Sequence, residues 1–202
     1  MIKFGCLLVI ALFSFNMHGN IRKDIQAAKV STENADVLVY EMNYLNTIYT
    51  YEMSIFKDDS IGLVVNWKMK NGAGKSGKMT ITDNAYQNAT QLQMGFQSGD
   101  KVLDKAVNLF LSKKLFGEFA SKNVANVFLS PTDGNPVKLI KQENSFTNCM
   151  VNGQIEKLFT STVTGFRNGK PVKIAYWDNA DFPVVLSSEQ EIALKLVEIR
   201  TK

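Results

Sequence analysis

The chain has 202 residues, 45% of them hydrophobic, and a formal net charge of +4 at pH 7. This length is enough for one domain with a sizeable core, and a small charge from scattered basic residues argues against nucleic-acid binding. The chain has one histidine and two cysteines, which are too few for a framework of several disulfides or for a four-ligand structural zinc site built from those residues alone.

The N-terminal segment has the pattern of a secretory signal peptide. A positive start at residues 1–3 precedes an apolar run, Phe4 to Phe15, and a more polar exit. The run is shorter than the roughly 20 residues that a membrane helix needs. We therefore expect residues 1–19 to be a signal peptide cleaved after Gly19, no membrane span, and a periplasmic or secreted location.

Cleavage would remove the only histidine, His18, and leave Cys149 as the one cysteine. Acyl transfer by a serine or cysteine nucleophile commonly relies on a histidine base, so the sequence predicts no catalytic residue of that kind. Cys149 is interpreted as a buried small hydrophobe.

Residues 20–36 are polar and without a clear period, which is typical of a tether, and we expect residues 37–202 to form a single β-rich domain. Apolar residues alternate with polar ones from Tyr49 to Phe56 and again from Ile61 to Met69, which predicts two half-buried strands. The turn residues between them favour a hairpin. A second turn at residues 71–74 leads into a third strand, about 75–82.

Two helices are expected in the middle of the chain. Asp83 is a candidate cap for the first, whose apolar stripe would end at Gly95. The stripe consists of Ala85, Ala89, Leu92 and Phe96. Residues 102–111 are predicted to form a strand, and Ser112 to cap a second helix that buries Leu115, Phe116 and Phe119.

The C-terminal half is predicted to be a meander of short strands separated by turns. The turn signals are residues 130–136, Asn152-Gly153, Asn168-Gly169 and Ser187-Ser188. This half lacks the crossover helices that parallel strands need. The expected fold class is α+β: a mainly antiparallel, curved sheet of about 8–10 strands with two short helices.

Motifs that would hold a phosphate or a metal ion are incomplete. Gly72 to Ser76 resembles the end of a phosphate-binding loop, but Met69 replaces its first glycine and a strand follows instead of a helix. Asp178 to Asp181 lacks the glycine and the distal glutamate of a calcium loop. We therefore predict no cofactor and no metal.

A carboxylate pair is the remaining route to catalysis, because glycoside hydrolysis needs two carboxyl groups of different pKa. Each candidate lies in a predicted turn or at a predicted solvent-facing position, where carboxylates are common without a catalytic role. They are Glu52, Asp58, Asp59, Glu118, Asp178 and Asp181.

Tyrosines cluster near the start of the predicted domain, at Tyr40, Tyr44, Tyr49 and Tyr51. Tyrosine has an apolar body and a polar tip, which suits a ligand wall as well as a core. We predict that Tyr49, Tyr51 and Trp67 line a ligand site, with core packing as the alternative.

Several stretches together carry a resemblance. They are 62–69, 77–81, 109–116, Asn152-Gly153 and 177–183. On these, the chain resembles a group of uncharacterised exported proteins of Gram-negative bacteria. The resemblance implies an envelope protein, and no activity or site residue comes with it.

Three functional hypotheses follow. The first is an exported non-enzymatic domain that binds an apolar or amphipathic ligand or an envelope protein. The second is a carboxylate-based hydrolase of the glycosidase kind. The third is a structural accessory subunit of the cell envelope.

Overall fold

The computed structural model describes residues 36–201 except residues 59, 72–73 and 191. The predicted signal peptide, and the predicted tether up to residue 35, lie outside the described residues. None of the described helices is long and apolar enough to cross a membrane.

The described part of the chain is mainly β. The strands of its N-terminal half are β1 (Asp36–Tyr44), β2 (Thr47–Asp58), β3 (Gly62–Met69), β4 (Ser76–Ile81), β5 (Gln91–Gln93), β6 (Gly99–Leu103) and β7 (Ala106–Asn108). Those of its C-terminal half are β8 (Val124–Val127), β9 (Val137–Lys141), β10 (Ser145–Val151), β11 (Gln154–Arg167), β12 (Lys170–Trp177), β13 (Val185–Glu189) and β14 (Ala193–Arg200). The two helices are α1 (Asp83–Asn88) and α2 (Lys113–Lys122).

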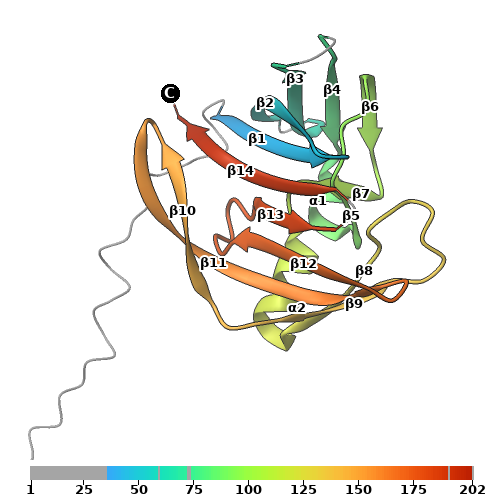
Figure 1. Cartoon of the computed structure of the whole chain (residues 1–202). Coiled ribbons are helices and arrows are strands. Elements are labelled where there is room, and N and C mark those ends of the chain that lie inside the picture. Colours follow the sequence, from blue (N-terminus) through green and yellow to red (C-terminus); the bar gives the residue numbers. More distant parts are fainter. Residues whose placement is uncertain (1–35, 59, 72–73, 191, 202) are drawn as a thin grey trace, which may run out of the picture.

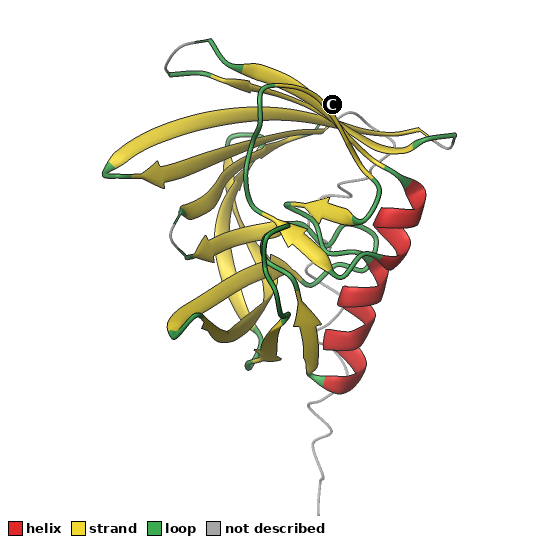
Figure 2. Ribbon diagram, turned by 90° about the vertical axis from the view of Figure 1, so that its right-hand side faces the viewer, coloured by secondary structure: helices red, strands yellow, loops and turns green. Residues whose placement is uncertain are grey.

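Among the described residues, twelve strands belong to one sheet, and β5 and β7 form a second, small one. The large sheet runs in the order β6-β4-β3-β2-β1-β14-β13-β12-β11-β9-β8, and β10 pairs with both β11 and β14. It therefore curls until β10 meets β14, so that β10, β11, β12, β13 and β14 form a closed ring (Figure 1). Both helices lie along one side of the molecule (Figure 2).

The predicted curved, mainly antiparallel sheet is confirmed, but the structure is mainly β rather than clearly α+β, and it has more strands than the 8–10 expected. Among the described strands, three pairs are parallel: β4 with β6, β5 with β7, and β10 with β14. The last lies in the C-terminal half, where none was expected. It arises because the curl of the sheet, rather than a crossover helix, brings the two strands together.

The first three strands are confirmed. β2 and β3 pair antiparallel from Tyr51↔Met69 to Asp58↔Gly62, and β3 pairs with β4. Tyr51, Met53 and Ile55 are buried on one face of β2, as their alternation predicts. The turn residues 72–73 lie outside the described residues.

The first predicted helix is much shorter than expected. Thr82, not Asp83, is the cap: its side chain accepts a hydrogen bond from the Ala85 N–H. The helix ends at Asn88, and Leu92 lies instead in β5, where its N–H donates to the Phe128 carbonyl. Pairing with a neighbouring strand thus overrides the helical spacing of the apolar residues.

Residues 102–111 form two strands, β6 and β7, instead of one, with Asp104 and Lys105 between them. The second helix is confirmed. Ser112 caps α2 by accepting from the Leu115 N–H, and Leu115 and Phe119 are buried while Phe116 packs against the core.

The two Asn-Gly turns and the loop at residues 130–136 are confirmed. Asn152-Gly153 joins β10 to β11 and Asn168-Gly169 joins β11 to β12, and all four residues have positive φ, as type I′ turns require. The predicted turn at Ser187-Ser188 is wrong: both residues lie inside β13 and pair with β14. Burial of Ser188 in the sheet outweighs the turn preference of serine.

Candidate functional site

The residues predicted to line a ligand site are only partly together. Tyr51 and Trp67 are buried neighbours with ring centroids 5.9 Å apart, and Phe96 stacks on Tyr51 at 4.3 Å. Tyr49 lies two residues before Tyr51 on β2 and is half-buried against the core. Sequence reasoning placed Phe96 on a helix and so missed it as a partner of this cluster.

The described cavity beside the cluster is small. A cavity of about 30 Å³ is lined by Trp67, Met79, Gln93 and Asn108, among others. That volume holds about one water molecule. The arrangement is that of packed core aromatics, and the ligand-binding role of Tyr49, Tyr51 and Trp67 stays a prediction.

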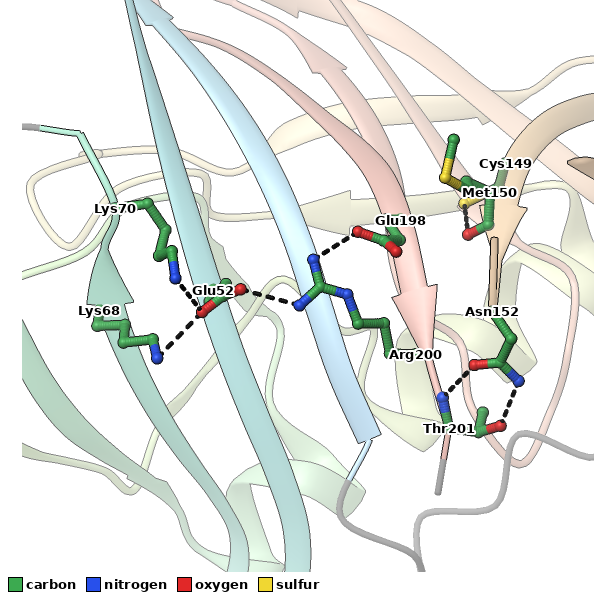
Figure 3. Close-up of polar contacts among 9 residues, drawn as sticks. All are labelled: Glu52, Lys68, Lys70, Cys149, Met150, Asn152, Glu198, Arg200 and Thr201. Atoms are coloured by element: carbon green, nitrogen blue, oxygen red, sulfur yellow. Dashed lines mark hydrogen bonds and ion pairs between the residues drawn. The ribbon is translucent and has the colours of Figure 1, made fainter. Parts of the chain in front are cut away.

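The outer face of β2, β3 and β14 carries a charge cluster (Figure 3). Glu52 on β2 lies 3.1 Å from Lys68 Nζ and 3.1 Å from Lys70 Nζ, and its other oxygen accepts from Arg200 at 2.9 Å. Arg200 also donates to Glu198 at 2.6 Å. The carboxylate of Glu52 is thus shared by three cations, and it is the most enclosed member, with a side chain 12% exposed.

The pKa of Glu52 follows from these contacts. Burial acts to raise its pKa, but hydrogen bonds from Lys68, Lys70 and Arg200 outweigh burial and lower the pKa to about 2. The bond from Arg200 likewise lowers the pKa of Glu198. Both groups are therefore charged throughout the physiological range, and neither suits a general acid, which needs a raised pKa.

The other candidate carboxylates are dispersed. Glu118 pairs with Lys122 along α2, Asp178 lies 3.7 Å from Lys141 Nζ, and hydrogen bonds from Ser60 lower the pKa of Asp58. Asp59 lies outside the described residues. Within the described part of the chain, no group of three or more histidine, cysteine, aspartate or glutamate residues could hold a metal ion.

Two open clefts lie on either side of Arg167, at the end of β11. Their volumes are about 580 and 460 Å³. The guanidinium between them donates twice to Asp133 Oδ1, at 3.0 and 2.7 Å, while Asp133 Oδ2 accepts the N–H groups of Leu129 and Ser130. Arg167 and Asp133 therefore fix the loop at residues 130–136 to the sheet, which is a structural role.

One group of exposed apolar side chains lies on the β10–β11 hairpin, at the left of Figure 1. Phe146 lies opposite Phe159, and Met150 lies opposite Ile155, on the same side of the two strands. These side chains are 51%, 41%, 42% and 74% exposed, respectively. Between the two apolar pairs lie Asn148 and Lys157, again opposite each other. We call the six residues the hairpin face.

The hairpin face is an extension of the core. Ser161 follows Phe159 on the same side of β11 and lies opposite Tyr176, whose ring packs against Phe116 and Phe119 of α2 at about 6 Å. The side of the sheet on which α2 packs against Tyr176 of β12 therefore continues along β11 and becomes exposed there. Leu158, on the other side, is fully buried, so β11 changes its buried side along its length.

A polar network marks the boundary. Ser161 Oγ lies 2.9 Å from Asn144 Oδ1 and 3.0 Å from Asp178 Oδ2, and Lys141 also reaches Asp178. Burial raises the pKa of the neighbouring Tyr176 to about 12. The network satisfies the buried Ser161 hydroxyl at the point where the helix cover ends.

Comparison with known proteins adds nothing to this description: no family model, no curated protein and no solved structure matches the chain.

Proposed function

We propose that this chain is an exported, non-enzymatic domain that binds an envelope protein through the hairpin face. The observation that carries the proposal is that large apolar side chains pair across the two strands while exposed to solvent, Phe146 with Phe159 and Met150 with Ile155. Large apolar side chains that are exposed on ordered strands and bordered by polar residues are typical of interaction sites.

Contact between the two phenylalanines supports a preformed surface. Their ring centroids are 5.5 Å apart, at an interplanar angle of 59°. Aromatic residues and methionine are enriched at protein interfaces, and a strand pair holds them without the entropy cost of ordering a loop. A partner would therefore meet a rigid surface.

Other functions have less support. A small apolar ligand needs a pocket of about 300 Å³ or more, lined mainly by apolar groups. The clefts of that size beside Arg167 are lined largely by polar residues, and the cavity beside Trp67 is far smaller. A glycosidase needs one carboxyl of raised pKa, whereas the pKa values of Glu52, Asp58 and Glu198 are all lowered.

The export part of the proposal rests on the N-terminal sequence pattern alone. N-terminal sequencing of material recovered from the periplasm or the medium tests it. Loss of residues 1–19 is the expected result, and an intact Met1 on the folded protein would contradict it.

Site-specific photo-crosslinking in cells that make the protein tests the binding part. A photoreactive residue replaces Phe159 or, as a control, Val102, an exposed apolar residue on β6. We expect one discrete adduct with another protein from position 159 and none from position 102. The adduct should disappear when Phe146→Asp is added and persist when Val102→Asp is added.

Equal adducts from both positions, an adduct insensitive to Phe146→Asp, or no adduct at all would each contradict the proposal. Circular dichroism of each purified variant establishes that it is folded.

A further inference from the structure

We propose that the partner presents an amphipathic helix in which an acidic side chain lies between two large apolar ones, and that Lys157 selects it. This inference rests on the proposed function. It adds the chemistry of the partner, which the apolar pairs alone do not define.

Charge is the first argument. Lys157 is exposed at the centre of the hairpin face, between the two apolar pairs, and has no ion pair among the residues that the structure describes. The other five residues of the face are uncharged, and Glu156 points to the opposite side, toward Cys149. A partner that covered the face with apolar groups alone would bury an unpaired ammonium, which costs several kcal/mol. A carboxylate at the centre removes that cost.

Spacing is the second argument. The two apolar pairs are four residues apart along each strand, which is about 13 Å at ~3.3 Å per residue. Eight residues of α-helix span about 12 Å. Apolar side chains at positions i and i+8 of a helix would therefore meet the two pairs, and an acidic residue at i+4 would lie on the same helix face, opposite Lys157.

Continuity with α2 favours a helix over an added strand. On the same side of the sheet, α2 already packs through Phe116 and Phe119 against Tyr176. The partner helix would occupy the next part of that side, beyond the polar network of Ser161 and Asp178. The fold thus already uses helix-on-sheet packing at this surface.

A second copy of the chain fits poorly. In a two-fold symmetric contact each subunit uses the same patch, so a dimer that buries both apolar pairs also brings two Lys157 ammonium groups into one interface, and none of the six residues of the face is a carboxylate that could pair with them. Two like charges that are close together and without a counter-charge are destabilising.

A membrane also fits poorly, because the tip of the hairpin is polar. Asn152, Gly153 and Gln154 form the tip, and Asn152 is bound to Thr201 by two hydrogen bonds of 2.8 Å (Figure 3). A hairpin that inserts into a bilayer would be apolar at that end.

Designed peptides test the selection. Three helix-forming peptides carry Leu at i and i+8 and differ only at i+4, which is Glu, Gln or Lys. Fluorescence anisotropy at low salt measures their Kd for the folded protein. We expect the Glu peptide to bind about fivefold more tightly than the Gln peptide, as for one ion pair, and the Lys peptide to bind most weakly.

Charge reversal supplies the control. Lys157→Glu should invert the order of the three peptides, while Lys101→Glu, at an exposed site on β6, should leave it unchanged. Phe146→Asp should abolish binding of all three. An order that is insensitive to Lys157→Glu, or no binding of the Glu peptide at 1 mM, overturns the inference.

Two further outcomes would also overturn it. One is saturable binding to vesicles of phosphatidylcholine and phosphatidylglycerol that is lost in Phe146→Asp. The other is dimerisation at micromolar concentration that is lost in the same variant. The crosslinking experiment at Phe159 tests the proposed function separately. If the adduct depends on Phe146 but the order of peptide affinities does not depend on Lys157, the proposed function stands and only the inference about the acidic helix is rejected.

Discussion

The hydroxyl of Tyr40 donates a hydrogen bond to the carbonyl oxygen of Val185 at 2.6 Å. The two residues are 145 positions apart, on β1 and β13, and β14 lies between those strands in the sheet. The hydrogen bond therefore crosses β14 on the buried side of the sheet and stabilises the curvature that closes the ring. Burial raises the pKa of Tyr40 well above its usual value, so the hydroxyl keeps its proton.

Tyr40→Phe should lower the free energy of unfolding by about 1–3 kcal/mol, because the buried Val185 carbonyl loses this donor. Urea unfolding followed by circular dichroism measures the change. Tyr49→Phe, at a half-buried position of β2, is the control and should change the free energy of unfolding by less than about 0.5 kcal/mol. Equal effects of the two substitutions would contradict a special role for Tyr40.

Glu52→Gln should destabilise the protein by about 1–2 kcal/mol near pH 7, because three cations lose the carboxylate that they share. The loss should be smaller at high salt, which screens the repulsion among the cations. Glu143→Gln, at an exposed site, is the control and should have little effect at any salt concentration.

The same glutamate predicts a pH dependence. Its pKa is about 2 in the folded protein, below the value of about 4.5 of a free glutamate. A lowered pKa stabilises the folded state fully above the unfolded-state pKa, and the stabilisation is lost as the pH falls from about 4.5 to 2. Unfolding measured between pH 2 and 7 should show the gap between wild type and Glu52→Gln closing in that window. A constant gap would show that Glu52 acts through packing instead.

Gly62→Ala should destabilise the protein by about 2 kcal/mol or more. Gly62 has φ +114°, and a Cβ built there would lie 2.2 Å from the Ile81 carbonyl oxygen, so strain and a backbone clash combine. Gly134→Ala is the matched control, because φ is not positive there and nothing lies within 4 Å of the new Cβ. Thermal unfolding compares the two, and similar melting temperatures would contradict the prediction.

The parts of the fold that could be predicted from the sequence are those set by local chemistry. Alternation along β2 and β3 predicts which side chains are buried, and the two Asn-Gly turns predict hairpins because both residues adopt positive φ. Leu92 shows the limit: its helical spacing from Ala85 and Ala89 is overridden by hydrogen bonding to Phe128, 36 positions along the chain. Nothing in the sequence near Leu92 indicates that Phe128 is its hydrogen-bond partner.

The hairpin face could not be predicted, for a related reason. Both sides of β10 and β11 carry apolar residues, with Cys149 and Leu158 on one and Phe146 and Phe159 on the other. The periodicity of the sequence shows which side chains share one side of a strand, but it does not show which of the two sides faces the core. That choice depends on the ring closing through β10 and β14, where Met150 lies beside Glu198.

Trp67→Ala and Phe159→Ala should separate core from surface aromatics. Trp67 is buried against Phe96 and Tyr51, so its removal should cost about 3–5 kcal/mol of unfolding free energy. Phe159 is exposed and loses mainly its contact with Phe146, which is worth about 0.2–1 kcal/mol. Urea unfolding measures both, and the Phe159 variant should lose at most about 1 kcal/mol of stability while it binds the Glu peptide more weakly. If Trp67→Ala instead left the stability unchanged, the aromatic cluster would not be a packed core. The ligand site that the sequence predicts there would then have more support than the hairpin face as the binding surface.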